Sequence, residues 1–214
     1  MRKIIFTLMI LFGVGMSFEP TVVSAATDDF NIKIDGKFAD WDDKPKNDVY
    51  YKDHGPMKEA SLLADDKYIY YYVSMSKNHK DTYPFQTIDY QLTVGNRQHT
   101  IYIKNAWDIK PNKNTKVLLQ DTSNGDRNLV NSPAIVHRFV GPGYDYAIME
   151  CRIPYEDLDA ASMAGQDISM KTPQLGMQII TAVGGSTGPF ILAGVGVVIA
   201  AFGIFKYRKR KIVK

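Results

Sequence analysis

The sequence EASLLADDKYIYYYVS, residues 59–74, is the part of the chain that most strongly indicates the fold. Residues 59–63 alternate in polarity, and residues 67–74 are dense in aromatic and β-branched side chains, both of which favour β-strands. Asp65 and Asp66 lie between the two runs, and Asp is frequent in tight turns. The stretch therefore predicts an antiparallel β-hairpin.

Similar patterns recur on both sides of this hairpin. A second hairpin is predicted at residues 90–104, where Gly95-Asn96 suits a type II′ turn. A third antiparallel pair is predicted around Gly141-Pro142-Gly143, and no stretch of residues 27–183 keeps a 3.6-residue apolar period. We expect about eight to ten short strands in an all-β, antiparallel β-sandwich. The other expected elements are strands at 30–34, 50–51, 117–120, 168–170 and 175–183, and one helical turn at 155–160.

The C-terminal segment 184–214 has three parts in a fixed order. Small and polar residues (184–189) precede an apolar run (190–205), and six cations follow between Lys206 and Lys214. The strictly apolar part has 16 residues, and flanking residues extend it toward the roughly 20 that cross a bilayer. We expect one transmembrane helix at about 188–207 with a cytoplasmic basic end.

The N-terminus predicts export. Arg2 and Lys3 precede an apolar run from Ile4 to Phe18, and small residues follow at 23–26. This is the layout of a secretory signal peptide, with cleavage expected after Ala26; an uncleaved anchor is the alternative. Together with the basic C-terminal end, it predicts a single-pass protein whose domain 27–183 lies outside the cell, by the positive-inside rule.

The composition of the exported part excludes several classes of protein. Without the signal peptide and the tail cations, 18 Lys and Arg remain against 22 Asp and Glu, a net charge of about −4. The basic residues that raise the isoelectric point therefore lie in the terminal segments, and nucleic acid is not an expected partner. Cys151 is the only cysteine, so no internal disulfide is expected, and we expect its side chain to be buried in the core.

The usual catalytic motifs are missing from the exported part of the sequence. Residues 27–183 contain no G-x-S-x-G, no H-E-x-x-H, no phosphate-binding glycine loop and no Cys/His cluster. The histidines at 54, 79, 99 and 137 are separated, and we expect them at the surface or at strand edges. We therefore expect a protein that is not an enzyme.

Three motifs in order resemble the family 9 carbohydrate-binding modules. They are Asp35-Gly36-x-x-x-Asp40-Trp41, the hairpin of residues 59–74, and Glu150-x-x-Ile153-Pro154. The family's first hallmark is D-G-x-x-D-W, so this chain has one more residue before Asp40. The resemblance spans about residues 30–183 and implies a β-sandwich that binds sugar between aromatic rings and often carries calcium. We expect Trp41 to plug one end of the sandwich rather than bind sugar.

The candidate ligand-binding residues are aromatic side chains on loops, because flat rings stack on sugars. Trp107 is the first choice, since it lies among Asn105, Asp108, Lys110 and Asn112; packing within its loop is the alternative. The others are Tyr83, Phe85, Tyr144 and Tyr146. For a possible calcium ion, the oxygen ligands would be Asp35, Asp40, Asp42 and Asp43; no other cofactor is expected.

The C-terminal tail looks like the sorting signals of Gram-positive Firmicutes that pair with exosortase-type processing enzymes. The recognition and cleavage residues would be Gly184, Gly185, Gly188 and Pro189, just before the apolar run. A plain uncleaved anchor is the alternative.

The expected function is a non-catalytic binding module at the cell surface, with a glycan or wall polymer as ligand. The alternative is a structural or partner-binding envelope protein. A remoter one is a haem-binding sandwich, as relatives of this superfamily can hold haem. Met57, Met75 or His137 would then be axial ligands.

Overall fold

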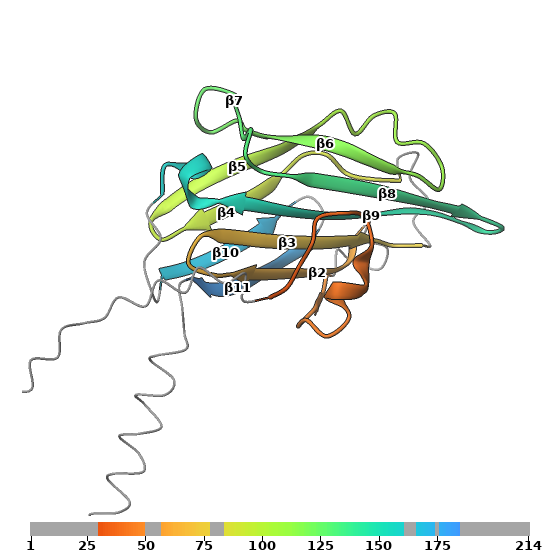
Figure 1. Ribbon diagram of the computed structural model, residues 1–214, viewed down its shortest axis with the longest axis horizontal. Helices are drawn as coiled ribbons and strands as arrows, with labels where there is room; N and C mark the ends of the chain where they lie inside the picture. Colours follow the sequence, from red (N-terminus) through yellow and green to blue (C-terminus); the bar gives the residue numbers. More distant parts are fainter. Residues whose placement is uncertain (1–29, 50–56, 78–83, 161–165, 174–175, 185–214) are drawn as a thin grey trace, which may run out of the picture.

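The computed structural model describes residues 30–49, 57–77, 84–160, 166–173 and 176–184. The described part is almost wholly antiparallel β-sheet, with two single-turn 3₁₀-helices (Figure 1). This confirms the all-β class. The elements are η1 (Phe38–Trp41), β1 (Asn47–Asp48), β2 (Met57–Ala64), β3 (Tyr68–Met75), β4 (Tyr90–Val94), β5 (Arg97–Lys104), β6 (Asn114–Asp121), β7 (Arg127–Asn128), β8 (Ala134–Gly141), β9 (Tyr144–Pro154), η2 (Tyr155–Leu158), β10 (Gln166–Thr172) and β11 (Gly176–Gly184).

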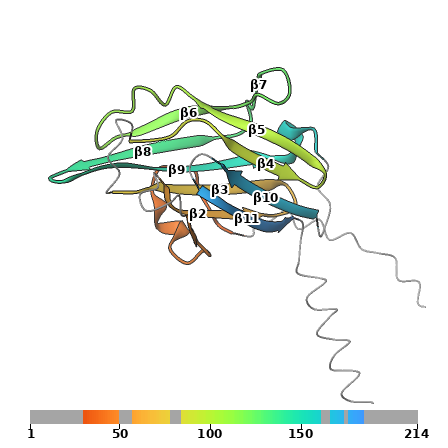
Figure 2. The same ribbon diagram turned by 180° about the vertical axis from the view of Figure 1, so that it is seen from behind.

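The strands form one sheet that folds over on itself. Its order is β1-β2-β3-β9-β8-β6-β5-β4-β10-β11, with β7 beside β6. The first half of β6 pairs with β8 and the second half with β5, so β6 belongs to two layers. β11 returns to lie alongside β2, and the sheet nearly closes (Figures 1 and 2). The two layers of a sandwich are present, but they are continuous through β6.

The predicted hairpins are confirmed. In the first, Ala64 lies opposite Ile69, and the Asp65 side chain accepts hydrogen bonds from the backbone N–H groups of Lys67 and Tyr68. In the second, Val94 lies opposite Arg97 across the two-residue turn. Gly95 has φ +59°, which an L residue adopts only with strain, as the first position of a type II′ turn requires. The strands β8 and β9 and the turn η2 also lie where the sequence predicts them.

Two expected elements differ from the structure. Residues 30–34 are not a strand; the segment crosses the outer face of β2 and β3. Its apolar and polar residues alternate because the Ile32 side chain packs against the sheet while its neighbours Asn31 and Lys33 are exposed. The strand expected at 117–120 is longer and begins at Asn114. The possible strand at 50–51 lies outside the described residues.

The apolar side chains form two clusters, one on each face of the β2–β3–β9 layer. The large inner core lies between the layers and includes Tyr71, Leu92, Leu119 and the buried Cys151, as expected for the cysteine. A smaller outer cluster is formed by Ile32, Trp41, Leu63, Tyr70 and Tyr72. Trp41 is fully buried, but under the N-terminal segment on the outer face rather than at the end of the sandwich.

The two ends of the fold carry different loops. The β4–β5 turn, η2 and the last residue of β11, Gly184, lie at one end, because Gly95 bonds to Asp167 and Gly184 lies opposite Gln166. The β5–β6 loop and the tip of the β8–β9 hairpin lie at the other, which we call the distal end (Figure 1). An eight-residue strand such as β5 spans about 25 Å between them.

Candidate functional site

The β5–β6 loop holds Trp107 in an exposed position. The Trp107 side chain is 67% exposed, although the neighbouring Ala106 and Ile109 are buried. The indole Nε1 donates a hydrogen bond of 3.1 Å to the Tyr102 hydroxyl. Because its polar atom is satisfied and its ring faces solvent, the indole presents apolar surface that the loop does not bury.

The loop that carries Trp107 is fixed to β8. Asn112 Oδ1 accepts from the Val140 N–H at 3.0 Å, and Asn112 Nδ2 donates to the Val140 carbonyl at 3.1 Å. The Arg138 guanidinium donates to the Ile109 carbonyl at 3.2 Å. Asn112 has φ +55°, a conformation that Asn tolerates better than most residues. The loop is therefore held on the side that follows Trp107, which orients the exposed ring.

A row of aromatic rings runs along the outer face of β8 and β9. Phe139 and Tyr146 are cross-strand partners with stacked rings, 5.1 Å apart and 16° from parallel. His137 lies 4.3 Å from Phe139, and Tyr144 lies 5.9 Å from Tyr146, measured between ring centroids. Tyr144 is 41% exposed, and the Lys77 ammonium lies 5.1 Å from the Tyr146 ring centroid.

Trp107 lies on the β5–β6 loop and the aromatic row on the neighbouring strands β8 and β9, and both are outside the inner core. Strand alternation puts Ile101 and Ile103 of β5 in the inner core and Tyr102 on the outer face. The same alternation puts Ala147 and Met149 inside and Tyr146 on the outer face, where it stacks on Phe139 and is partly buried against the core. We call the residues Tyr102, Trp107, His137, Phe139, Tyr144 and Tyr146 the distal aromatic surface. The sequence suggested three of them, and the other three were missed because their face depends on strand pairing.

The other two candidate ligand residues, Phe85 and Tyr83, are not part of this surface as the structure describes it. Phe85 is only 4% exposed and packs in the inner core, so its prediction as a surface contact is corrected: the apolar ring is part of the packing between the layers. Tyr83 lies outside the described residues.

The four acidic candidates for calcium surround η1. Asp35 Oδ1 accepts from the Lys37 N–H at 2.9 Å, and Asp40 Oδ2 accepts from the Lys33 N–H at 2.8 Å. Asp42 and Asp43 are exposed and pair with Lys46 and Lys44. Within the described ranges, no three His, Cys, Asp or Glu side chains are grouped closely enough to hold a metal ion.

Glu150 joins the two sequence motifs that are farthest apart in the chain. Its Oε1 accepts from the N–H groups of Asp35 and Gly36, at 2.9 and 2.6 Å. Its Oε2 accepts from Trp41 Nε1 at 2.9 Å. Glu150 is fully buried, and burial raises its pKa to about 7 although the three donors favour the carboxylate. The first and last motifs thus form one structural clamp.

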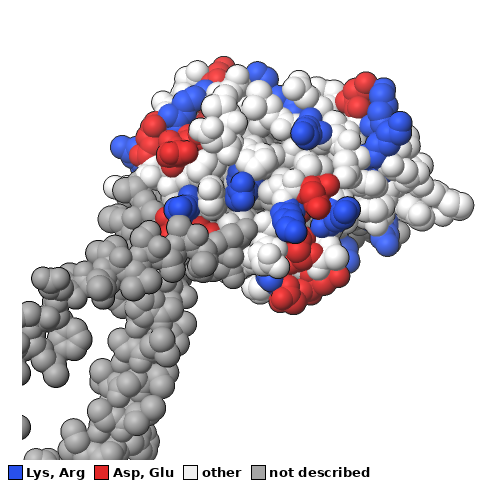
Figure 3. All heavy atoms as spheres, in the orientation of Figure 1, with Lys and Arg blue, Asp and Glu red and all other residues white. Residues whose placement is uncertain are grey.

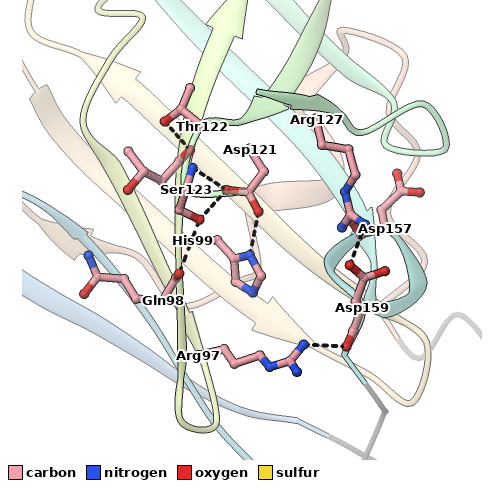
Figure 4. Close-up of polar contacts among 10 residues, drawn as sticks. Arg97, Gln98, His99, Asp121, Thr122, Ser123, Arg127, Asp157 and Asp159 are labelled. Atoms are coloured by element: carbon pink, nitrogen blue, oxygen red, sulfur yellow. Dashed lines mark hydrogen bonds and ion pairs between the residues drawn. The ribbon is translucent and has the colours of Figure 1, made fainter. Parts of the chain in front are cut away.

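A buried polar cluster lies at the end that carries η2 (Figure 4). His99 Nδ1 lies 2.7 Å from Asp121 Oδ2, and both side chains are buried, which corrects the expectation that His99 is a surface residue. The Ser123 hydroxyl donates to Asp121 Oδ1 at 2.6 Å rather than to the histidine. This order differs from a nucleophile–histidine–acid relay, in which the hydroxyl bonds to the imidazole. The contacts instead tie the loop after β6 to β5.

The candidate haem ligands lie on different faces of the sheet. Met57 and Met75 are cross-strand partners in the inner core. His137 lies on the outer face, where its Nδ1 is 2.5 Å from Asn114 Oδ1. The sheet therefore separates the histidine from both methionines.

Charged side chains of both signs are interspersed over the face shown in Figure 3. This differs from the continuous basic stripe by which many proteins contact nucleic-acid phosphates. Among the residues that the structure describes, no helix is long and apolar enough to cross a membrane; the expected span at 188–207 lies outside them. Ala26, Gly185, Gly188 and Pro189 also lie outside the described residues.

The sequence matches no protein-family model. No curated protein and no solved structure matches it either.

Proposed function

We propose that the protein is a cell-surface-anchored, non-catalytic binding module for a glycan or wall polymer. Its domain would stand outside the cell after signal-peptide removal, held by one C-terminal transmembrane helix or by whatever an exosortase-type enzyme attaches after cleavage. The motifs at residues 35–41, 59–74 and 150–154 resemble those of family 9 carbohydrate-binding modules, and this resemblance supports a sugar ligand. The ligand would bind the distal aromatic surface.

The exposure of Trp107 is the observation that carries the proposal. An indole that is 67% exposed has little role in folding, and its hydrogen bond to Tyr102 fixes its orientation. A fixed, exposed ring can stack on the C–H face of a sugar at a low cost in conformational entropy. Lys104 flanks Tyr102 along β5, and Gln120 lies opposite it on β6; both side chains can hydrogen-bond sugar hydroxyls.

The position of Trp107 also supports outward presentation. β11 ends at Gly184, at the end of the fold opposite the β5–β6 loop (Figure 1). If the chain continues from Gly184 into a membrane anchor, the distal aromatic surface faces away from the bilayer. A ligand in the wall or outside the cell would then reach it without passing the membrane.

The test is a glycan array probed with the purified full chain in detergent. We expect binding to a defined set of glycans, reduced at least tenfold in Trp107→Ala with an unchanged melting temperature. The matched control is Val130→Ala, which removes another exposed apolar side chain, 76% exposed, after β7. Equal binding by wild type and Trp107→Ala would contradict the proposed site, and binding to no glycan would favour a structural or protein-binding role.

A further inference from the structure

The structure contains a groove at the end opposite the distal aromatic surface. It lies between the β2–β3 turn and η2, has a volume of about 430 Å³, and includes Asp66, Lys67, Tyr68, Tyr155 and Glu156 among its lining residues. Its volume falls within the range of roughly 300–1,000 Å³ typical of small-molecule sites. Tyr68 lies opposite Pro154, ten residues from Tyr144 at the other end of β9, so about 30 Å of strand separates the groove from that tyrosine.

The walls of this groove are preorganised. Asp65 accepts from the N–H groups of Lys67 and Tyr68 and from the Tyr70 hydroxyl, at 2.7–2.8 Å. The Tyr155 N–H donates to the Lys67 carbonyl at 3.1 Å, which ties η2 to the β2–β3 turn. The guanidinium carbon of Arg152 lies 4.5 Å from the Tyr68 ring centroid. A ligand would therefore meet a site that needs little rearrangement, which favours affinity.

One buried group in the groove lining has an unmet bonding capacity. Tyr155 is 3% exposed, and its hydroxyl has no hydrogen-bond partner in the part of the chain that the structure describes. Burial, and then the carboxylates of Asp65 and Asp66, raise the pKa of Tyr155, so it remains a neutral hydroxyl. A buried hydroxyl without a partner costs about 1–3 kcal/mol. Tyr155 also packs in the inner core, so it contributes a wall of the groove rather than a hydroxyl contact.

The charges along the groove select the ligand. The groove lining carries two carboxylates, Asp66 and Glu156, and one ammonium, Lys67, beside the Tyr68 ring. The Arg152 guanidinium lies against that ring. Carboxylates form strong charge-assisted hydrogen bonds with a protonated amine. We propose that the groove binds a saccharide that carries a free amine, such as a glucosamine oligomer. This inference rests on the proposed function for the saccharide part of the ligand, and on the carboxylates for the amine.

The test compares two probes by isothermal titration calorimetry on the full chain in detergent. The probes are a glucosamine tetramer, at a pH where its amines are protonated, and the N-acetylated tetramer, which has no charge. We expect the glucosamine tetramer to bind at least tenfold more tightly. Weaker binding at higher salt is also expected, because the contacts are partly exposed and ionic.

Charge-changing variants identify the groove. Glu156→Gln should weaken binding of the glucosamine tetramer about three- to tenfold, and Lys67→Gln should strengthen it by removing a like charge. Both side chains are exposed, so both variants should fold with the wild-type melting temperature. The opposite pair of effects would identify an anionic ligand and overturn the proposal, as would equal binding of the two tetramers.

The Trp107→Ala variant separates this inference from the proposed function. We expect it to lose binding on the glycan array and to keep the affinity for the glucosamine tetramer. If Trp107→Ala abolishes tetramer binding and Glu156→Gln does not change it, the amine sugar binds the distal aromatic surface and the groove proposal is wrong. If the groove variants behave as expected but Trp107→Ala binds every glycan normally, the proposed function fails at its own site and the groove stands.

Discussion

Glu150 is the residue that holds the N-terminal segment to the sheet. Its carboxylate accepts two backbone N–H groups and the Trp41 indole N–H, from residues more than 100 positions earlier in the chain. Gly36, one of the donors, has φ +80°, and an added Cβ there would lie 2.1 Å from the Asn114 side chain. A side chain at Gly36 would therefore both strain the backbone and displace a neighbour.

The raised pKa of Glu150 predicts a pH-dependent stability. Its pKa rises from 4.5 to about 7 on folding, so the folded state holds the proton more tightly. That contribution is fully present below pH 4.5 and is lost as the pH rises through 7. We expect the free energy of unfolding of the fragment 27–184 to fall by up to about 3 kcal/mol across this window.

The control for the pH prediction is Glu150→Gln, which keeps an acceptor for the Asp35 and Gly36 N–H groups but does not titrate. Urea unfolding of both proteins from pH 5 to 8 gives the difference in their unfolding free energies at each pH. The contributions of the histidines to this difference cancel, because both proteins contain them. We expect this difference to shrink with rising pH; two parallel curves would show that Glu150 does not titrate in this range.

Trp41 should be essential to the outer cluster. Its side chain has no exposure, its ring centroid lies 5.4 Å from that of Tyr72, and it donates to Glu150. Trp41→Ala is expected to cost about 3–5 kcal/mol, as aromatic truncations in cores do. This is a large share of the stability of a typical domain, so the fragment should barely fold. Circular dichroism during urea unfolding measures the loss, with Trp107→Ala expected within about 0.5 kcal/mol of wild type.

At the scale of elements, η2 is attached to the β7–β8 loop by one carboxylate. Asp157 accepts from the Asn131 N–H and side-chain amide at 3.0 Å and from the Ser132 hydroxyl at 2.8 Å. Arg127 of β7 donates to the Asp157 carbonyl and forms an ion pair with Asp159 at 2.6 Å (Figure 4). A single turn of 3₁₀-helix has few bonds of its own, so these contacts hold it in place.

Asp157→Ala should therefore loosen this end of the fold. Losing three side-chain hydrogen bonds, and leaving the buried Ser132 hydroxyl without its acceptor, is expected to cost about 2–4 kcal/mol of unfolding free energy. The matched control is Asp167→Ala, because Asp167 is exposed on β10 and its substitution should change stability by less than about 0.5 kcal/mol. Equal losses in the two variants would contradict the assigned role.

At the scale of the whole molecule, the proposed membrane anchor and the proposed ligand surface lie at opposite ends of the sheet. The chain leaves β11 at Gly184 at the end that carries η2, and Trp107 lies at the opposite end. Protease added to intact cells should digest the region 27–187 and spare an epitope placed after Lys214, by the positive-inside rule. Protection of the domain in intact cells would exclude the proposed orientation.

The boundary of the sheet also sharpens a prediction about processing. Because Gly184 is the last residue of β11, Gly185 and Gly188 can be replaced by Leu without altering a described strand. We expect these substitutions to block removal of a C-terminal epitope that is lost from the wild-type chain, measured by the size of the mature protein. If the epitope stays on both proteins, the tail is a plain anchor.

The sequence by itself determined the local part of this fold. The strands β3, β4, β5, β8 and β9 and the turns between them follow from runs of β-favouring residues and from turn residues such as Asp65 and Gly95, which act on their own neighbours. The burial of Trp41 and Cys151 also followed from residue type and context. The exposure of Trp107 remained a choice between two alternatives until its loop was seen.

Only the tertiary structure decided which groups meet. Residues 30–34 alternate like a strand, but both edges of β3 are already paired with β2 and β9, so the segment crosses the face of the sheet instead. The partners of Glu150 and the pairing of His99 with Asp121 join residues far apart in sequence, and no local pattern encodes them. Phe85 and Tyr144 are both aromatic residues near turns. One is buried and the other exposed because a side chain's face depends on which strands lie beside it.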